Sequence, residues 1–262
     1  MTEPTRTLLI TGASSGIGFA TALAFCRRGW NVAAVARRAD RLTALVEDGR
    51  GLSGNILPLT ADVTDREAMR RAIEATVTHF GRLDALVANA GIGQRGAVVE
   101  AEWAHLDAVL RTNLDGVYHT IRAGVPALRQ SGGGQIVIIS SVLATLIAPY
   151  YATYAASKAF TASFAASLRM ELEDDRIGVT EMRVGRTATE FNARRLGSTD
   201  NAPKQSHKLV PVMTPEFVAE GIVRAVERRS KVVYLRWFDR MLAWGGVIAP
   251  GVMGRFSRAQ YR

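Results

Sequence analysis

The chain has 262 residues, a formal net charge of +9 and a hydrophobic content of 48%. Its length suits one large α/β domain or two small ones, and its apolar content excludes an intrinsically disordered chain. The single cysteine, Cys26, excludes an internal disulfide framework and a cysteine-based zinc site. The four histidines lie far apart without ligand spacing, so we predict no metal site.

The sequence contains no uninterrupted apolar stretch of the roughly 20 residues that a transmembrane helix needs. Its first six residues, Met1–Arg6, are polar and lead directly into an apolar run, which is unlike a signal peptide. We therefore expect a cytoplasmic protein.

Short β-type runs alternate with longer helical patterns along most of the chain. The predicted strands are residues 7–10, 31–36, 56–59, 84–88, 135–140, 177–182 and 231–235. The predicted helices are residues 16–29, 38–48, 65–80, two within 101–130, 153–173 and 215–229. Alternation at this spacing indicates βαβ units. We predict an α/β fold, a doubly wound parallel sheet of about seven strands with helices on both faces.

A glycine-rich segment, residues 11–18, lies between the first predicted strand and the first predicted helix. Glycines let the backbone turn sharply and approach a pyrophosphate, while the helix N-terminus offers unpaired N–H groups and partial positive charge. Such a segment alone could be only a tight connection, but a strand before it and a helix after it favour phosphate binding. The predicted cofactor contacts here are Gly12, Ser14, Ser15, Gly16, Ile17 and Gly18.

Two arginines, Arg37 and Arg38, follow the second predicted strand. In a site for NAD, an acidic residue at about this place holds the ribose hydroxyls. Here the acid is missing, and a guanidinium could pair with the 2′-phosphate of NADP(H). The alternative is two ordinary surface arginines at the start of a helix. The absence of an acid favours NADP(H).

Tyr154 and Lys158 are four positions apart in a predicted helix, so both side chains can point into one cleft. Free tyrosine has a pKa of about 10. We expect the nearby ammonium to lower that pKa, so that Tyr154 can serve as general acid in carbonyl reduction and general base in alcohol oxidation.

Further motifs follow in an order that resembles the short-chain dehydrogenase/reductase family, the type with TGxxxGIG and YxxxK motifs. The matched positions are residues 11–18, Asp62, Val63, Asn89, Ala90, Gly91, Asn113, Ser141, Tyr154 and Lys158. The resemblance extends to about residue 235 and implies a Rossmann-like fold. We expect a single dinucleotide-binding and catalytic domain over residues 1–235, with a substrate lid at about 186–212.

The resemblance also implies roles for these residues. Asp62 and Val63 would contact the adenine, and residues 89–91 would lie beside the cofactor. Ser141 would hydrogen-bond the substrate oxygen, and Lys158 would also hold the nicotinamide ribose. Asn113 would support a proton relay through water. The implied catalytic residues are Asn113, Ser141, Tyr154 and Lys158, of which Tyr154 and Lys158 also contact the cofactor.

One segment departs from the family pattern. After the sixth predicted strand the family has a Pro-Gly pair, but here Val184 stands in place of the proline and precedes Gly185. A missing proline leaves φ less fixed. The resemblance still implies contacts with the nicotinamide carboxamide from Gly185, Thr187 and Thr189.

The tail, residues 236–262, is both basic and apolar. Between residues 222 and 262 there are nine basic residues and two acidic ones. We favour burial of the tail, either within the enzyme, where it would cover the substrate cleft with an apolar wall, or against another subunit. The second interpretation is contact with a membrane interface, which would suit a lipophilic or steroid-like ketone. Nucleic acid is a weaker candidate, because no recognition motif accompanies the charge.

The sequence thus predicts an NADP(H)-dependent oxidoreductase that acts on a ketone, an aldehyde or a secondary alcohol. The substrate would be a small molecule and the protein a homodimer or homotetramer, with no nucleic-acid partner. The alternative is a nucleotide-sensing regulatory protein that uses the same fold without catalysis.

Overall fold

The computed structural model describes residues 4–197 and 211–259. Its strands form one sheet in which every pair is parallel, in the order β3-β2-β1-β4-β5-β6-β7. The strands are β1 (Thr7–Thr11), β2 (Asn31–Ala36), β3 (Ile56–Thr60), β4 (Ala85–Ala88), β5 (Gly134–Ser141), β6 (Ile177–Val184) and β7 (Val232–Tyr234). This order confirms the predicted Rossmann-like doubly wound sheet.

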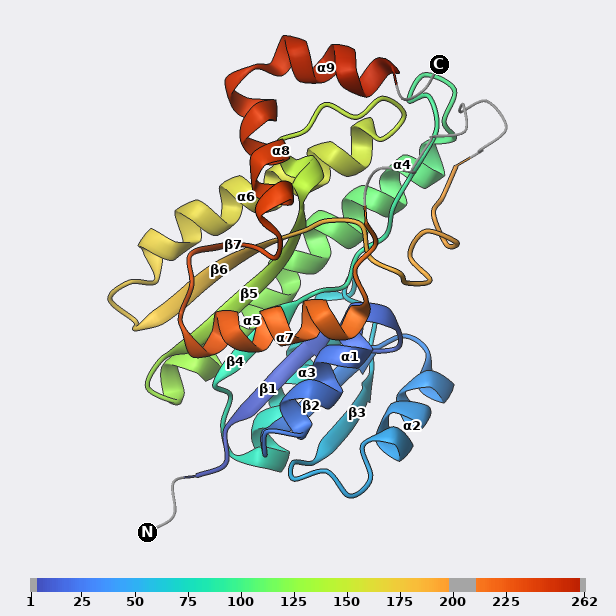
Figure 1. Ribbon diagram of the computed structural model, residues 1–262. Helices are drawn as coiled ribbons and strands as arrows, with labels where there is room; N and C mark the ends of the chain where they lie inside the picture. The colour runs from blue at the N-terminus through green and yellow to red at the C-terminus, as the bar shows by residue number, and fades with distance from the viewer. Residues whose placement is uncertain (1–3, 198–210, 260–262) are drawn as a thin grey trace.

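Helices cover both faces of the sheet, as Figure 1 shows. They are α1 (Gly16–Cys26), α2 (Ala39–Asp48), α3 (Arg66–Phe80), α4 (Trp103–Leu110), α5 (Gly116–Gln130), α6 (Ala152–Glu171), α7 (Pro215–Glu227), α8 (Trp237–Ile248) and α9 (Pro250–Ala259). A five-residue π-helical turn, Arg111–Asp115, joins α4 to α5. Helices α8 and α9 lie together at the end of the molecule opposite the N-terminus (Figure 1).

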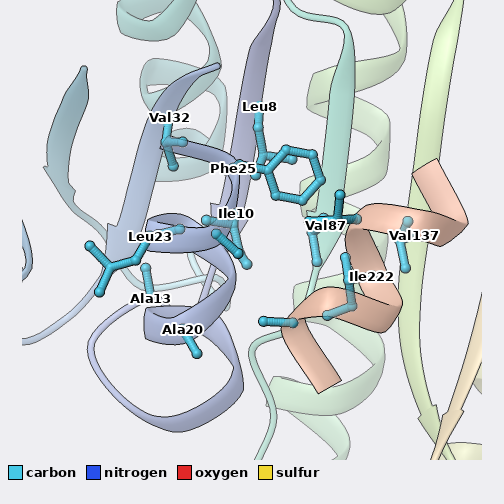
Figure 2. Close-up of a cluster of buried hydrophobic side chains, with 14 of the residues drawn as sticks. Leu8, Ile10, Ala13, Ala20, Leu23, Phe25, Val32, Val87, Val137 and Ile222 are labelled. Carbon is cyan, nitrogen blue, oxygen red and sulfur yellow. The ribbon is translucent and has the colours of Figure 1, made fainter. Parts of the chain in front are cut away.

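Two apolar layers hold the sheet between its helices. Successive strand residues point to opposite faces, so Leu8 and Ile10 enter one layer while Leu9 enters the other. Figure 2 shows the first layer, where Phe25 of α1 and Ile222 of α7 meet the strands. Helices α3, α5 and α6 build the second layer. Each large apolar side chain buried in this way stabilises the fold by about 1.5–3 kcal/mol.

The predicted elements differ from the observed ones mainly at their ends. The first helix stops at Cys26 rather than continuing to residue 29, because the chain turns back at Gly29, whose φ is +75°. Strand β6 runs on to Val184. The tail forms two helices, α8 and α9, that its sequence did not predict.

Part of the predicted lid, residues 198–210, and the last three residues of the predicted tail lie outside the described residues. Among the helices that are described, none is both long and apolar enough to cross a membrane.

Candidate active site

A cavity of about 860 Å³ opens where the chain leaves the carboxyl ends of strands β1 to β6. Strands β1 and β4 are neighbours in the sheet, but the chain continues from β1 to β2 on one side and from β4 to β5 on the other. Ligands of open parallel sheets bind at the place where the strand order reverses in this way. All the predicted cofactor residues except Gly18 line the cavity, as does Ser141. The topology therefore gathers residues from across the sequence into one place.

The glycine-rich turn after β1 has the shape of a phosphate cradle. Gly12 and Gly16 have φ values of +70° and +53°, which favour glycine. Gly18 lies behind the turn, where a Cβ atom would stand 2.3 Å from the Gly12 carbonyl oxygen. The side-chain amide of Asn89 donates to the Thr11 carbonyl at 2.9 Å and ties the turn to the end of β4. The residues present therefore fit the pyrophosphate of a dinucleotide.

The two arginines after β2 occupy different positions. The Arg38 guanidinium donates to the Ser14 and Ser15 hydroxyls at 3.0 and 2.9 Å, beside the phosphate cradle. Arg37 is largely exposed and lies 3.5 Å from the Asp62 carboxylate. Arg38, rather than Arg37, is thus the cation built into the turn.

Glu190, from the predicted lid, forms an ion pair with Arg38. Its carboxylate contacts Arg38 at 3.1 Å, Arg41 at 3.2 Å and Arg194 at 3.2 Å. The hydrogen bond from Arg38, followed by the charges of the neighbouring arginines, lowers the pKa of Glu190. The start of the predicted lid is therefore attached to the cofactor end of the cavity.

Tyr154 and Lys158 both point into the cavity from α6, as their spacing predicted. The Lys158 ammonium lies 5.8 Å from the centre of the Tyr154 ring. It is buried and donates to the Ile139 carbonyl at 2.8 Å. Ser141, the last residue of β5, hydrogen-bonds Tyr154. The three side chains thus form one cluster on two adjoining elements.

The expected lowering of the Tyr154 pKa is wrong for the protein alone. Desolvation raises the pKa of Tyr154 to about 12, although the hydrogen bond with Ser141 acts in the opposite direction. Burial also lowers the pKa of Lys158 to about 8. At neutral pH the cluster therefore holds a neutral phenol and a lysine that is still mostly protonated.

Asn113 lies behind the cavity rather than on its wall, within the π-helical turn between α4 and α5. Its side-chain oxygen accepts from the Ile92 amide at 2.9 Å. Its amide donates to the Ile92 carbonyl at 3.0 Å and to the Ser157 hydroxyl at 2.9 Å. Ile92 itself lines the cavity. Asn113 thus links the loop after β4 to α6 one residue before Lys158.

A buried ion pair supports the segment in which Val184 replaces the family's proline. Arg236 holds Asp239 by two hydrogen bonds of 2.7 Å, and Asp239 is 1% exposed. A Cβ on Gly185 would lie 2.8 Å from both side chains, so a larger residue there would displace this pair. The backbone after β6 is therefore packed against the start of the tail.

Sequence reasoning offered an apolar cleft wall from the tail as one alternative, but it assigned no particular residue to the outer part of the cavity. The ring of Phe191 lies 5.6 Å from that of Tyr154, and Arg195 donates to the Tyr151 hydroxyl. Apolar side chains complete the wall, namely Leu143, Leu146, Ile147, Leu242, Met253 and Phe256. Three of these come from α8 and α9. No motif marks them, because their placement depends on how the tail folds back.

Burial of Lys158 makes the stability of the protein depend on pH. Its pKa falls from 10.5 to about 8 on folding, so between these values the unfolded chain binds more protons and stability rises with pH. From pH 7 to pH 9.5 we expect the unfolding free energy of the wild type to gain about 2 kcal/mol relative to Lys158→Met. Urea denaturation of both proteins at the two pH values measures this. An equal pH response in both would contradict the buried, partly deprotonated lysine.

Comparisons with known proteins agree with this architecture. A family model described as short chain dehydrogenase matches residues 6–198. The 11-beta-hydroxysteroid dehydrogenase 1A of Arabidopsis thaliana is 38% identical over 266 residues, which cover 98% of this chain and 75% of the relative.

Two solved structures are similar over nearly the same length. A 3-oxoacyl-[acyl-carrier protein] reductase with bound NAD from Brucella melitensis is 31% identical, with a TM-score of 0.75, over 88% of this chain and 89% of that one. An alcohol dehydrogenase from Thermococcus sibiricus, complexed with 5-hydroxy-NADP, is 26% identical, with a TM-score of 0.73, over 87% of this chain and 95% of that one. Since the family model spans well over half of the residues, the chain belongs to the short-chain dehydrogenase family.

Proposed function

We propose that the protein is an NADP(H)-dependent oxidoreductase that interconverts a ketone or aldehyde and the corresponding alcohol, with Tyr154 as general acid and base. One observation carries the proposal. The Tyr154, Ser141 and Lys158 cluster opens into the same cavity as a turn shaped for a dinucleotide pyrophosphate. A nucleotide sensor has no need of a tyrosine that shares the cavity with a buried lysine, so catalysis accounts for more of the site.

The cofactor would be held along the whole cavity floor. Gly12, Ser14, Ser15, Gly16 and Ile17 would surround the pyrophosphate, with Gly18 giving the space for that approach. The adenosine end would lie against Arg38, Asp62 and Val63, and residues 89–91 would follow it inward. Lys158 would hold the nicotinamide ribose, and Gly185, Thr187 and Thr189 the carboxamide. When bound, the nicotinamide supplies or accepts the hydride.

The protein's own groups would orient the substrate and move the proton. Ser141 and Tyr154 hold the carbonyl oxygen between two hydroxyls, and this polarises the carbonyl carbon. In reduction Tyr154 donates the proton of its hydroxyl to that oxygen, and Lys158 stabilises the phenolate that remains. A Tyr154 pKa of about 12 keeps the phenol protonated before the reaction, which suits a proton donor.

Asn113 would act as a positioning residue. Its hydrogen bonds hold the Ile92 backbone and Ser157, whose own hydroxyl donates to the Tyr154 carbonyl at 2.7 Å. In this arrangement Asn113 fixes the position of the loop after β4 relative to the turn of α6 that carries Tyr154 and Lys158. A proton that leaves Tyr154 would be replaced through water near the Ile92 carbonyl, which lies in this network.

The outer cavity favours a lipophilic substrate. Its wall combines aliphatic side chains from the loop after β5, such as Leu146, with Leu242, Met253 and Phe256 of α8 and α9. Apolar surface of this kind binds apolar compounds through loss of contact with water. The Arabidopsis thaliana relative, named as a hydroxysteroid dehydrogenase, supports the same substrate class.

We also propose that residues 1–235 form the dinucleotide-binding and catalytic domain, to which the tail adds the outer wall. The protein would be cytoplasmic and a homodimer or homotetramer. Two observations support self-association: Tyr118 of α5 is 40% exposed beside Phe160 and Phe164 of α6, and Trp103 of α4 is 75% exposed. Apolar surface of this kind on neighbouring helices is typical of subunit contacts.

A panel of carbonyl compounds tests the proposed function. We expect the full-length protein to oxidise NADPH with lipophilic ketones and to show much lower kcat/KM with small polar ones. The absorbance of NADPH at 340 nm follows the reaction. Saturable binding of NADPH without turnover of any compound would instead support the nucleotide sensor.

A further inference from the structure

Helix α8 is apolar on two opposite sides. One side is buried: Ala243 and Gly246 pack inward, and Gly246 has no room for a Cβ because the Thr145 carbonyl would lie 2.3 Å away. The other side is exposed although it is apolar. Trp237, Met241, Trp244 and Ile248 recur there at spacings of four, three and four residues and are 74%, 62%, 54% and 72% exposed.

Helix α9 extends this exposed surface with Val252 and Phe256, one turn apart. We call the combined surface the docking face. Its apolar members are Trp237, Met241, Trp244, Val247, Ile248, Val252 and Phe256, and its exposed basic members are Arg240, Arg255 and Arg258. Both helices lie together at one end of the molecule (Figure 1). A single surface therefore offers large apolar side chains among arginines.

The docking face carries no exposed acidic group. The only acid in α8 and α9 is Asp239, which is buried and held by Arg236 at 2.7 Å. Arg240 lies 5.9 Å from the centre of the Trp244 ring. The face is thus positively charged around its aromatic side chains, which calls for an occupant that is apolar inside and negative at its surface.

We propose that the docking face binds the surface of an anionic lipid bilayer. Tryptophan rings favour the headgroup level, arginines pair with lipid phosphates, and an amphipathic helix can lie in the interface plane. Helices of 12 and 10 residues are too short to span a bilayer, so they lie on it.

A second copy of the chain is a poorer occupant. A two-fold contact places the same patch on both subunits. The arginines of one docking face would then meet the arginines of the other, with no exposed carboxylate on either face to neutralise them. An anionic bilayer provides both the missing negative charge and an apolar interior.

The docking face also borders the mouth of the cavity. Phe256 is 53% exposed and lines the cavity, and so does Ile147, which is 49% exposed. Ile147 lies 3.6 Å from where a Cβ of Gly254 in α9 would stand. A protein seated on this face would therefore open its cavity toward the lipid, so that a lipophilic ketone could enter without crossing water. This last step rests on the proposed function, whereas the docking itself does not.

Co-sedimentation of the full chain with vesicles tests the docking. We expect strong binding to phosphatidylcholine vesicles that contain about one third phosphatidylglycerol, and weak binding to phosphatidylcholine alone. The double variant Trp244→Glu/Val247→Glu should lower the partition coefficient at least about tenfold, because it removes apolar contact and adds repelling charge. Met170→Glu, a change at a 78% exposed residue near the end of α6, is the matched control and should bind like the wild type.

A second variant keeps the test independent of any folding defect. Arg255→Gln/Arg258→Gln changes only exposed side chains and should lower binding to the anionic vesicles about tenfold or more, at roughly 1 kcal/mol per cation. Wild-type protein that binds both vesicle types equally, or not at all, would overturn the proposal. A second outcome would also overturn it: in light scattering the Trp244→Glu/Val247→Glu variant has half the molar mass of the wild type, while its vesicle binding is unchanged. That result would mean that the docking face joins two copies of the chain. None of these measurements uses turnover, so the docking can fail while the proposed oxidoreductase stands.

Discussion

Replacing Tyr154 with phenylalanine is expected to lower kcat/KM for NADPH-dependent ketone reduction by about 10²- to 10⁴-fold. Phenylalanine keeps the ring and its contact with Phe191 but removes the hydroxyl that hydrogen-bonds Ser141. The loss should appear equally in kcat and kcat/KM, because proton donation is an interaction made only in the transition state. Steady-state kinetics with the best ketone of the panel measures it.

Tyr118→Phe provides the matched control for this experiment. The Tyr118 side chain is 40% exposed on α5 and does not line the cavity, so loss of its hydroxyl should leave kcat/KM within about twofold. Titration of NADPH by fluorescence should give a Kd for Tyr154→Phe within about threefold of the wild-type value, because one cofactor contact is lost while the rest of the cavity lining remains. If Tyr154→Phe keeps more than a tenth of the wild-type activity, Tyr154 is not the general acid.

The layered fold could be predicted because local pattern and burial agree in its centre. The run Ile136–Ile139 is apolar without alternation, which is typical of a strand covered on both faces, and β5 is such a strand. Helix ends were predicted less well, since they depend on single turns. Asp65, for example, caps α3 by accepting from the Ala68 amide at 2.9 Å, so it precedes the helix that was predicted to start there.

The inner part of the site could be predicted because spacing along a helix is a local property. Tyr154 and Lys158 share a face of α6 whatever surrounds them. Their pKa values could not be predicted in the same way, because desolvation depends on tertiary packing. The expected lowering of the Tyr154 pKa considered the neighbouring ammonium alone, whereas burial dominates in the folded protein.

The outer part of the site depends on contacts between distant segments. Arg236 and Asp239 reach Gly185 across more than fifty residues of sequence. Leu242, Met253 and Phe256 belong to short helices that contain several glycines, a composition with weak helical preference. Packing against the loop after β5 holds these helices in place. Composition therefore identified the tail as apolar and allowed a cleft wall as one alternative, but it could not show which tail residues form that wall.

The preference between NADPH and NADH is expected to depend on Arg38. We expect Arg38→Ala to raise the Kd for NADPH about 10- to 100-fold while changing the Kd for NADH by less than about threefold, because a charge-assisted hydrogen bond contributes about 1.5–3 kcal/mol. The Arg38 guanidinium already holds Ser14 and Ser15, so it stands where the 2′-phosphate would meet the turn. Fluorescence titration with each cofactor measures both constants.

Arg37→Ala is the matched control, since Arg37 is the neighbouring cation with a 69% exposed side chain and contacts Asp62 instead. Its effect on NADPH should be several times smaller, because exposed charge pairs contribute little. Glu190 competes for Arg38, but Arg41 and Arg194 also hold its carboxylate. An incoming phosphate can therefore take over Arg38 without leaving Glu190 unpaired. An unchanged ratio of the two Kd values in Arg38→Ala would place the 2′-phosphate elsewhere, and a larger effect from Arg37→Ala would exchange the roles of the two arginines.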